Sequence, residues 1–217
     1  MDMKHSPTRR HLLKWGAGAS TVAVVGALLP NFGISAALGA DLGSGDIGVL
    51  NYAYALEQLE AAFYTQVVAN PFSDMGPNDR TVLTQLRDHE VAHREFLRDA
   101  LGRRRIPDLD VDFSKVNFRS RRSVLTTAQT FEDLGVSAYN GAGQLLTNGD
   151  HLAAAGSIVS VEARHASAIR DLLRPVSSYA VGKGVVSDGL DSALLPSSVL
   201  KQAGPFIATE VTAQALP

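Results

Sequence analysis

Two four-residue stretches, Glu90-Val91-Ala92-His93 and Glu162-Ala163-Arg164-His165, determine the fold expected for this chain. Each has a glutamate followed three residues later by a histidine, inside a segment with helical periodicity. Residues three apart lie on one face of a helix, so each pair directs a carboxylate and an imidazole the same way. One such pair is common by chance, whereas two in matching contexts predict paired ligands for metal ions.

Around these stretches, apolar residues recur at spacings of three and four and predict four long helices. The predicted helices span residues 46–70, 78–101, 123–147 and 150–174. The first ends before Pro71, because a residue before proline disfavours the helical conformation. The second is expected to start with Asn78 or Asp79 as its cap and to stop at Gly102.

The segment between the second and third predicted helices covers residues 103–122. An extended chain advances about 3.3 Å per residue, so these residues can run the roughly 35 Å length of such a helix. Short loops join the other helices into antiparallel hairpins. We therefore predict an all-α fold, a four-helix bundle over residues 46–174 with a long crossover between helices 2 and 3. Residues 175–217 form a C-terminal extension with one short helix near 197–203, and the last ten residues are expected to be disordered.

The two halves of the predicted bundle repeat one another. Glu90 and Glu162 align at an offset of 162 − 90 = 72 residues, together with the histidines that follow them. Glu57 and Glu132 align at 132 − 57 = 75, each with a tyrosine seven positions later. Because a duplicated hairpin produces a pseudo-twofold axis, metal ligands near that axis are expected in pairs.

This repeat distinguishes two glutamates on the first helix. Glu57 has a partner in Glu132, whereas Glu60 aligns with Gly135, so Glu57 is the better terminal ligand. Glu60, one turn away, is either an additional ligand or proton acceptor, or a partly exposed glutamate on the helix surface; both alternatives stay open.

The predicted metal ligands are all glutamates and histidines. They are Glu57, Glu60, Glu90, His93, Glu132, Glu162 and His165. Such a set suits two adjacent cations, and without cysteine it favours iron or manganese over thiolate-binding metals, with zinc also allowed. His89 and His151 lack such partners and are predicted to be exposed. Tyr64 and Tyr139 are interpreted as core tyrosines; the alternative is that they hydrogen-bond to the ligands or pass electrons.

These residues resemble the di-iron carboxylate pattern of the ferritin-like superfamily. The stretches Leu50-Asn51-Tyr52-Ala53, Leu59-Glu60-Ala61-Ala62-Phe63-Tyr64 and Val161-Glu162-Ala163-Arg164-His165-Ala166 are similar to the bacterial and plant ferritin-like family that includes desiccation-related proteins. The resemblance covers about residues 46–174 and implies a four-helix bundle with two iron ions. It leaves the activity open.

The first 40 residues differ from the rest. The stretch Thr8-Arg9-Arg10-His11-Leu12-Leu13-Lys14 precedes an apolar run at 15–29 and small residues at 35–40. This order predicts a twin-arginine export signal that is cleaved between residues 36 and 40; the alternative is an amphipathic or anchoring helix. The apolar run is shorter than the ~20 residues of a spanning helix. We therefore expect the twin-arginine translocase as a partner, a periplasmic, cell-envelope or secreted location, and no stable membrane span in the mature form.

Composition limits the remaining partners. The net charge is −2, and without residues 1–40 it becomes 16 − 21 = −5, which gives no indication of a nucleic-acid partner. Because there is no cysteine, no disulfide can stabilise the exported chain, so stability must come from packing and bound metal.

The sequence supports two classes of function. The leading hypothesis is an exported iron protein that oxidises Fe(II) with O2 or peroxide in stress protection, with a manganese catalase-like activity as a variant. The second is a non-enzymatic stress or desiccation-related structural protein that keeps the bundle without redox turnover. A homo-oligomer is compatible with both, and no catalytic residue is assigned.

Overall fold

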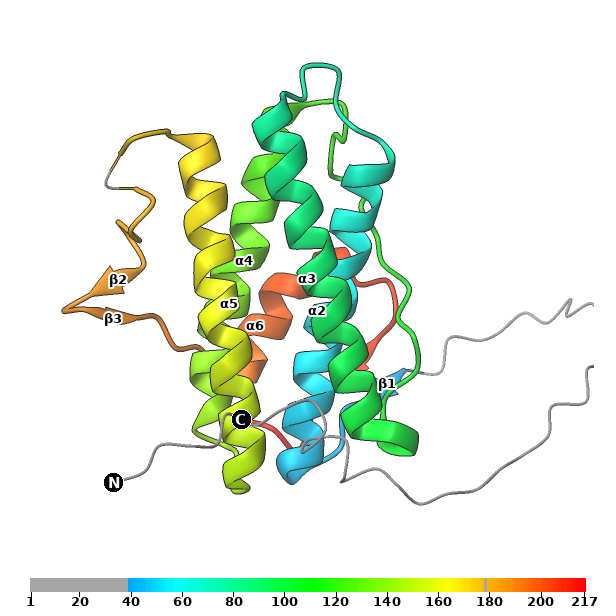
Figure 1. Cartoon of the computed structure of the whole chain (residues 1–217). Helices are drawn as coiled ribbons and strands as arrows, with labels where there is room; N and C mark the ends of the chain where they lie inside the picture. The colour runs from blue at the N-terminus through cyan, green and yellow to red at the C-terminus, as the bar shows by residue number, and fades with distance from the viewer. Residues whose placement is uncertain (1–38, 178) are drawn as a thin grey trace, which may run out of the picture.

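The computed structural model describes residues 39–177 and 179–217, so the predicted twin-arginine motif lies outside the described residues. Four long helices lie side by side (Figure 1). They are α2 (Gly45–Ala69), α3 (Pro77–Leu101), α4 (Arg121–Gly143) and α5 (Gly149–Leu173). Helix α2 packs chiefly against α3, and α4 against α5, so that two helical hairpins form the bundle. The predicted all-α four-helix fold is confirmed.

Residues at the helix ends account for where the helices begin and stop. The start of α3 and the end of α4 differ from the prediction. Helix α3 begins at Pro77 after Gly76, without a side-chain cap. Asp79, one of the two predicted caps, instead accepts two hydrogen bonds from Arg121. The cap of α5 is Asn148, whose side chain accepts a hydrogen bond from the backbone of the second residue in the helix.

Helix α4 ends at Gly143, four residues before the predicted end at 147. Glycine lowers helix stability by about 1 kcal/mol relative to alanine, and α4 carries glycines at positions 141 and 143. A close approach explains the first of them, because a Cβ atom at Gly141 would lie 1.9 Å from the carbonyl oxygen of Leu194. Gly141 therefore admits a neighbouring segment, and the two glycines together weaken the end of the helix.

The predicted crossover is confirmed as the segment 102–120, which starts with the 3₁₀ turn η2 (Gly102–Arg104). The buried Asn51 of α2 fixes its start, since it donates to the carbonyl of Arg104 at 3.0 Å and accepts from the backbone N–H of Ile106 at 2.9 Å. Further along, Phe113 stacks edge-on against Phe63 with 5.7 Å between the ring centres. The crossover is thus attached to α2 by both polar and aromatic contacts.

The C-terminal extension returns to the bundle. It contains a hairpin of β2 (Val186–Ser187) and β3 (Leu190–Asp191), helix α6 (Pro196–Ala203), the turn η3 (Gly204–Phe206) and β4 (Val211–Thr212). Strand β4 pairs in parallel with β1 (Ala40–Asp41), which precedes the bundle (Figure 1). The expected disorder of the last ten residues is therefore wrong: β4 pairs with β1, and the carbonyl of Pro217 accepts a hydrogen bond from the backbone N–H of Ser197. Among the described residues, no helix combines the length and apolarity needed to cross a bilayer.

Candidate metal centre

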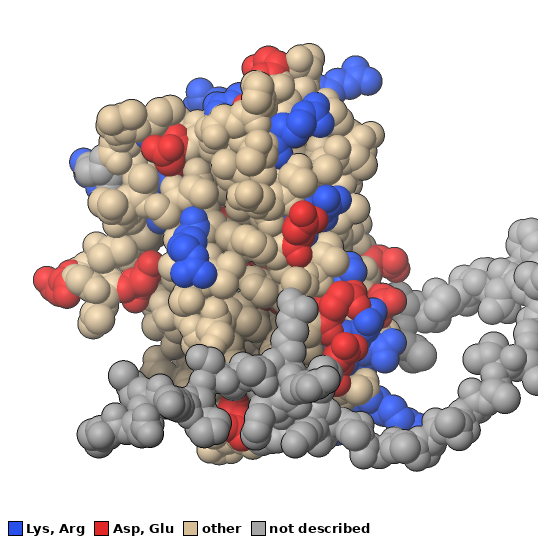
Figure 2. All heavy atoms as spheres, viewed as in Figure 1, with Lys and Arg blue, Asp and Glu red and all other residues tan. Residues whose placement is uncertain are grey.

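Four glutamates meet in the middle of the bundle, one from each long helix. They are Glu57 of α2, Glu90 of α3, Glu132 of α4 and Glu162 of α5, and each has 0% of its surface exposed. The apolar residues that flank them at helical spacings pack into the core and turn the carboxylates inward. Figure 2 shows Lys and Arg interspersed with Asp and Glu on one face of the molecule. The four glutamates of the site, by contrast, are buried.

The predicted ligands form two overlapping groups. In each group, four ligand atoms lie within 4.8 Å of one another. The first group is Glu57, Glu90, His93 and Glu162, and the second is Glu90, Glu132, Glu162 and His165. Because Glu90 and Glu162 belong to both, they stand between two neighbouring cation positions. Glu60 lies outside both groups.

Glu90 divides its two oxygens between the histidines. Its Oε2 lies 3.4 Å from Nδ1 of His93, and its Oε1 lies 2.7 Å from Nδ1 of His165. Glu162 uses one oxygen for both, since its Oε1 is 3.0 Å from His93 Nδ1 and 3.9 Å from His165 Nδ1. A carboxylate with one oxygen turned toward each position has the geometry to bridge two cations.

Apart from the contacts between the two histidines and the glutamates, the atoms that face the centre of the site have no hydrogen-bond partner among the described residues. They include Oε2 of Glu57 and Glu132, both oxygens of Glu90 and Glu162, and Nδ1 of both histidines. Two like charges 4 Å apart repel by ~4 kcal/mol even at an effective dielectric constant of 20. Burying four carboxylates that share only two imidazole groups is thus costly, and divalent cations would supply further positive charge and further partners. The donor set therefore fits a pair of metal ions.

Burial and mutual repulsion perturb the protonation of these groups. Burial and, next, the charge of Glu90 raise the pKa of Glu57 to about 7, although the neighbouring His93 lowers it. Burial and the charge of Glu90 likewise hold the pKa of Glu162 well above its usual range. Burial alone would lower the pKa of His165, but the carboxylates of Glu132 and Glu90 outweigh it and raise this pKa to about 11. Without cations, the cluster therefore retains protons at neutral pH.

Two tyrosines fix the outer oxygens of the terminal glutamates. Tyr139 of α4 donates to Oε1 of Glu57 at 2.5 Å. Tyr64 of α2 donates to Oε1 of Glu132 in the same way. Both hydroxyl groups are buried, so the tyrosines are core residues and also hydrogen-bond to the predicted ligands. The interpretation as core tyrosines alone was incomplete.

Glu60 is buried, with 3% of its surface exposed, so its interpretation as a partly exposed surface residue is wrong. It faces Gly135, where an added Cβ atom would lie 3.2 Å from Oε1 of Glu60 and 3.3 Å from Oε2 of Glu162. Gly135 thus leaves room for two carboxyl groups. Burial and the charge of Glu162 raise the pKa of Glu60 well above its ordinary value.

The prediction for the remaining histidines is partly wrong. His89 is exposed, as expected, but its Nδ1 lies 2.8 Å from Nε2 of His165, the ring nitrogen turned away from the cluster. The only sequence signal for this contact with His165 was the position of His89 directly before Glu90. His151 is half-buried and contacts Asp46 at 2.8 Å, which joins the first turn of α5 to the start of α2.

Comparison with known proteins agrees with this architecture. The model of a family described as a ferritin-like domain matches residues 45–175, which include all four helices of the bundle. A search of curated proteins finds no match to the chain.

Proposed function

Because the chain belongs to the ferritin-like domain family, we propose that its buried cluster binds two metal ions and oxidises iron. The observation that supports this most directly is the position of Glu90, whose two oxygens face the two histidines separately. Oxygen-rich ligation with imidazole and no thiolate suits iron, with manganese as the alternative.

In the proposed reaction, two Fe(II) ions are the substrate and supply one electron each. Dioxygen takes up these two electrons and two protons and leaves as hydrogen peroxide. With peroxide as the oxidant, the same two electrons and two protons yield two water molecules. Both reactions would limit oxidative damage by removing Fe(II), which otherwise converts peroxide into radicals. Only the reaction with peroxide also consumes a damaging oxidant, because the reaction with dioxygen releases peroxide.

The side chains of the chain have distinct tasks in this proposal. Glu57 and His93 hold one ion, Glu132 and His165 hold the other, and Glu90 with Glu162 bridges them. Glu60 lies beside Glu162 but outside both ligand groups. We therefore assign it to holding a proton next to the site, with ligation of an ion as the alternative.

Metal analysis after anaerobic Fe(II) loading tests the binding step. Two ions per chain are expected, and less than one ion per chain would refute the dinuclear site. Replacing both bridging residues, Glu90→Ala with Glu162→Ala, should abolish Fe(II)-dependent oxygen consumption while the helical circular dichroism signal persists. Unchanged consumption would show that the reaction occurs elsewhere.

A competing function is a structural, stress-related bundle in which metal adds stability without turnover. The complete burial of the four glutamates favours it, because a closed site can serve as a structural clamp. Metal that is bound and raises the unfolding temperature, with no consumption of oxygen or peroxide, would establish this alternative. Manganese with peroxide breakdown would instead indicate the catalase-like variant.

The paired arginines Arg9 and Arg10 support export through the twin-arginine translocase. We propose that the protein acts in the periplasm, in the cell envelope or outside the cell. Replacing both arginines by lysine should leave the precursor in the cytoplasm, as cell fractionation would detect. Export of this variant at the normal level would refute the route.

A further inference from the structure

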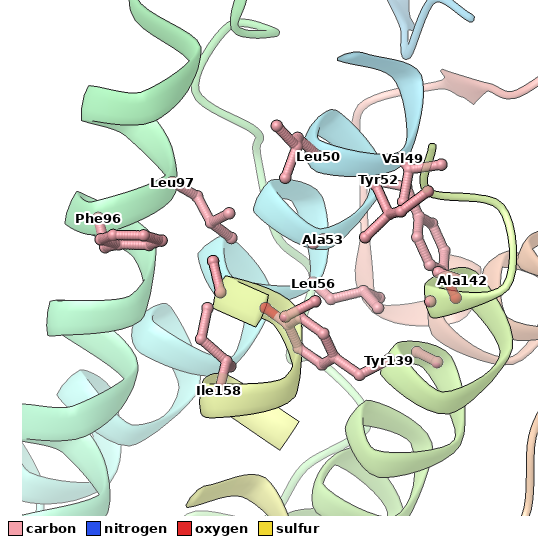
Figure 3. Close-up of a pocket in the computed structure, with 15 residues that line it drawn as sticks. Val49, Leu50, Tyr52, Ala53, Leu56, Phe96, Leu97, Tyr139, Ala142 and Ile158 are labelled. Carbon is pink, nitrogen blue, oxygen red and sulfur yellow. The ribbon is translucent and has the colours of Figure 1, made fainter. Parts of the chain in front are cut away.

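An apolar cavity of about 20 Å³ lies between the four long helices, on the side of the site that carries Glu57. Figure 3 shows side chains from these helices turned toward it. Small residues such as Ala53, Ala138 and Ala142 form much of its wall. Gly143 and Ala154 are half-buried, so this side of the cavity lies close to the surface.

Tyr139 connects this cavity to the metal centre. Its ring forms part of the wall, and its hydroxyl group donates to Glu57. Leu97, one helical turn after His93, lines the cavity from α3. A molecule in the cavity is therefore separated from the first ligand group by a single layer of side chains.

An aromatic side chain occupies the repeat-related position at the opposite end of the bundle. Ala138 aligns with Phe63 at 138 − 63 = 75, the offset that relates Glu132 to Glu57. Phe63 is fully buried and packs edge-on against Phe131, with 5.1 Å between the ring centres. Alanine in place of phenylalanine thus leaves a space beside Tyr139 that the aromatic cluster fills beside Tyr64.

The lining chemistry selects the occupant. A buried water requires two to four polar partners, but only Tyr52 and Tyr139 bring side-chain polar atoms to the wall. The hydroxyl group of Tyr139 gives its proton to Glu57 and can only accept a further bond, whereas that of Tyr52 is buried without a partner and can donate. A water in the cavity would therefore find at most two side-chain partners, the minimum of this range. Hydrogen peroxide has the same need for partners as water. An apolar molecule needs none.

The volume of the cavity also limits which apolar molecule can occupy it. On this measure of volume, one water fills ~10–15 Å³, so the cavity admits a molecule of about two heavy atoms and excludes an alkyl chain. We propose that the cavity binds molecular oxygen and delivers it to the Glu57 side of the metal centre, so that dioxygen, not peroxide, is the oxidant. The delivery step rests on the proposed iron oxidation, whereas the binding site does not.

Xenon, a probe for apolar gas sites, tests the cavity in metal-free protein. Crystals of the full chain pressurised with xenon should show one bound atom beside Tyr139, and the variant Ala138→Val should lose it. Absence of xenon from the native cavity overturns the inference, even if the protein oxidises iron. Conversely, bound xenon in a protein that takes up no Fe(II) refutes the proposed function and leaves the apolar site standing.

Kinetics test the delivery step. Ala138→Val and Ala154→Leu should raise the KM for oxygen several-fold in Fe(II) oxidation, without changing Fe(II) binding or the KM for peroxide. The matched control is Ala153→Leu, next to Ala154 on α5 but exposed and outside the cavity. An equal effect on both oxidants, or the same effect in the control, overturns the assignment of oxygen.

Discussion

Tyr64 of α2 donates a hydrogen bond to Glu132 of α4, and Tyr139 of α4 donates one to Glu57 of α2. Each tyrosine therefore donates its hydrogen bond to the glutamate of the other repeat. The bonded oxygen is Oε1 in both glutamates, which leaves Oε2 of Glu57 facing His93 at 3.4 Å and Oε2 of Glu132 facing His165 at the same distance. These two hydrogen bonds join the two hairpins and orient Glu57 and Glu132, the predicted terminal ligands.

Removing either hydroxyl group should weaken metal binding. Tyr139→Phe and Tyr64→Phe each leave a buried carboxylate oxygen without its donor, and loss of such a supporting contact typically lowers metal affinity ~10–100-fold. Titration calorimetry with Mn(II), which avoids oxidation, measures the effect. Tyr54→Phe is the control, because Tyr54 is equally buried on α2 but its hydroxyl group faces Asp108. A comparable loss in the control would contradict the role of the crossed pair.

Terminal and bridging glutamates should differ in metal stoichiometry. Glu57→Gln alters only the first ligand group, so the variant should keep the ion held by the second. Glu90→Gln alters both groups and should lose both ions. Native mass spectrometry of Mn(II)-loaded protein counts the ions directly. Equal stoichiometry in the two variants would show that Glu90 does not bridge.

The metal-free protein should lose stability as pH rises. The folded pKa of Glu57 is raised to about 7 and that of His165 to about 11, so the folded state binds more protons than the unfolded state. Where the folded state holds the extra proton, stability falls with increasing pH. The contribution of Glu57 is lost as pH rises through 7, and that of His165 as pH rises toward 11.

Urea unfolding with a chelator between pH 5 and pH 9 tests this dependence, and Glu57→Gln should flatten it. Metal-loaded protein should be more stable at the upper end of this range, because bound ions replace the protons and stabilise the folded state. Metal-free stability that rises with pH would mean that the cluster is ionised without cations.

Gly135→Ala should disturb the site although alanine favours helices. The added Cβ atom would approach Glu60 and Glu162 within 3.2 and 3.3 Å, which displaces a bridging carboxylate. We expect weaker metal binding, and partial recovery when Glu60→Ala removes the facing side chain. Gly156→Ala on α5 is the matched control, because it meets open space and should stabilise the protein by about 0.5–1 kcal/mol. Metal affinity that stays unchanged in Gly135→Ala would contradict the crowding.

The sequence alone determined what depends on local spacing. Helical periodicity predicted the four helices, and the distance of three residues placed His93 beside Glu90 and His165 beside Glu162 on their helix faces. The repeat added Glu57 and Glu132, because an offset shared by two hairpins constrains positions far apart in the chain. The predicted end of α4 was wrong because the effect of Gly141 depends on its contact with Leu194, which is distant in the sequence.

Only the tertiary structure decided how the helices face one another. The pairing of Tyr139 with Glu57 joins residues 82 positions apart, and His89 reaches His165 across 76. Such contacts depend on the rotation and separation of packed helices, which periodicity within one helix does not specify. The same holds for Glu60, whose burial against Gly135 is a relation between α2 and α4. The cavity beside Tyr139 likewise exists because side chains from four helices leave a space together.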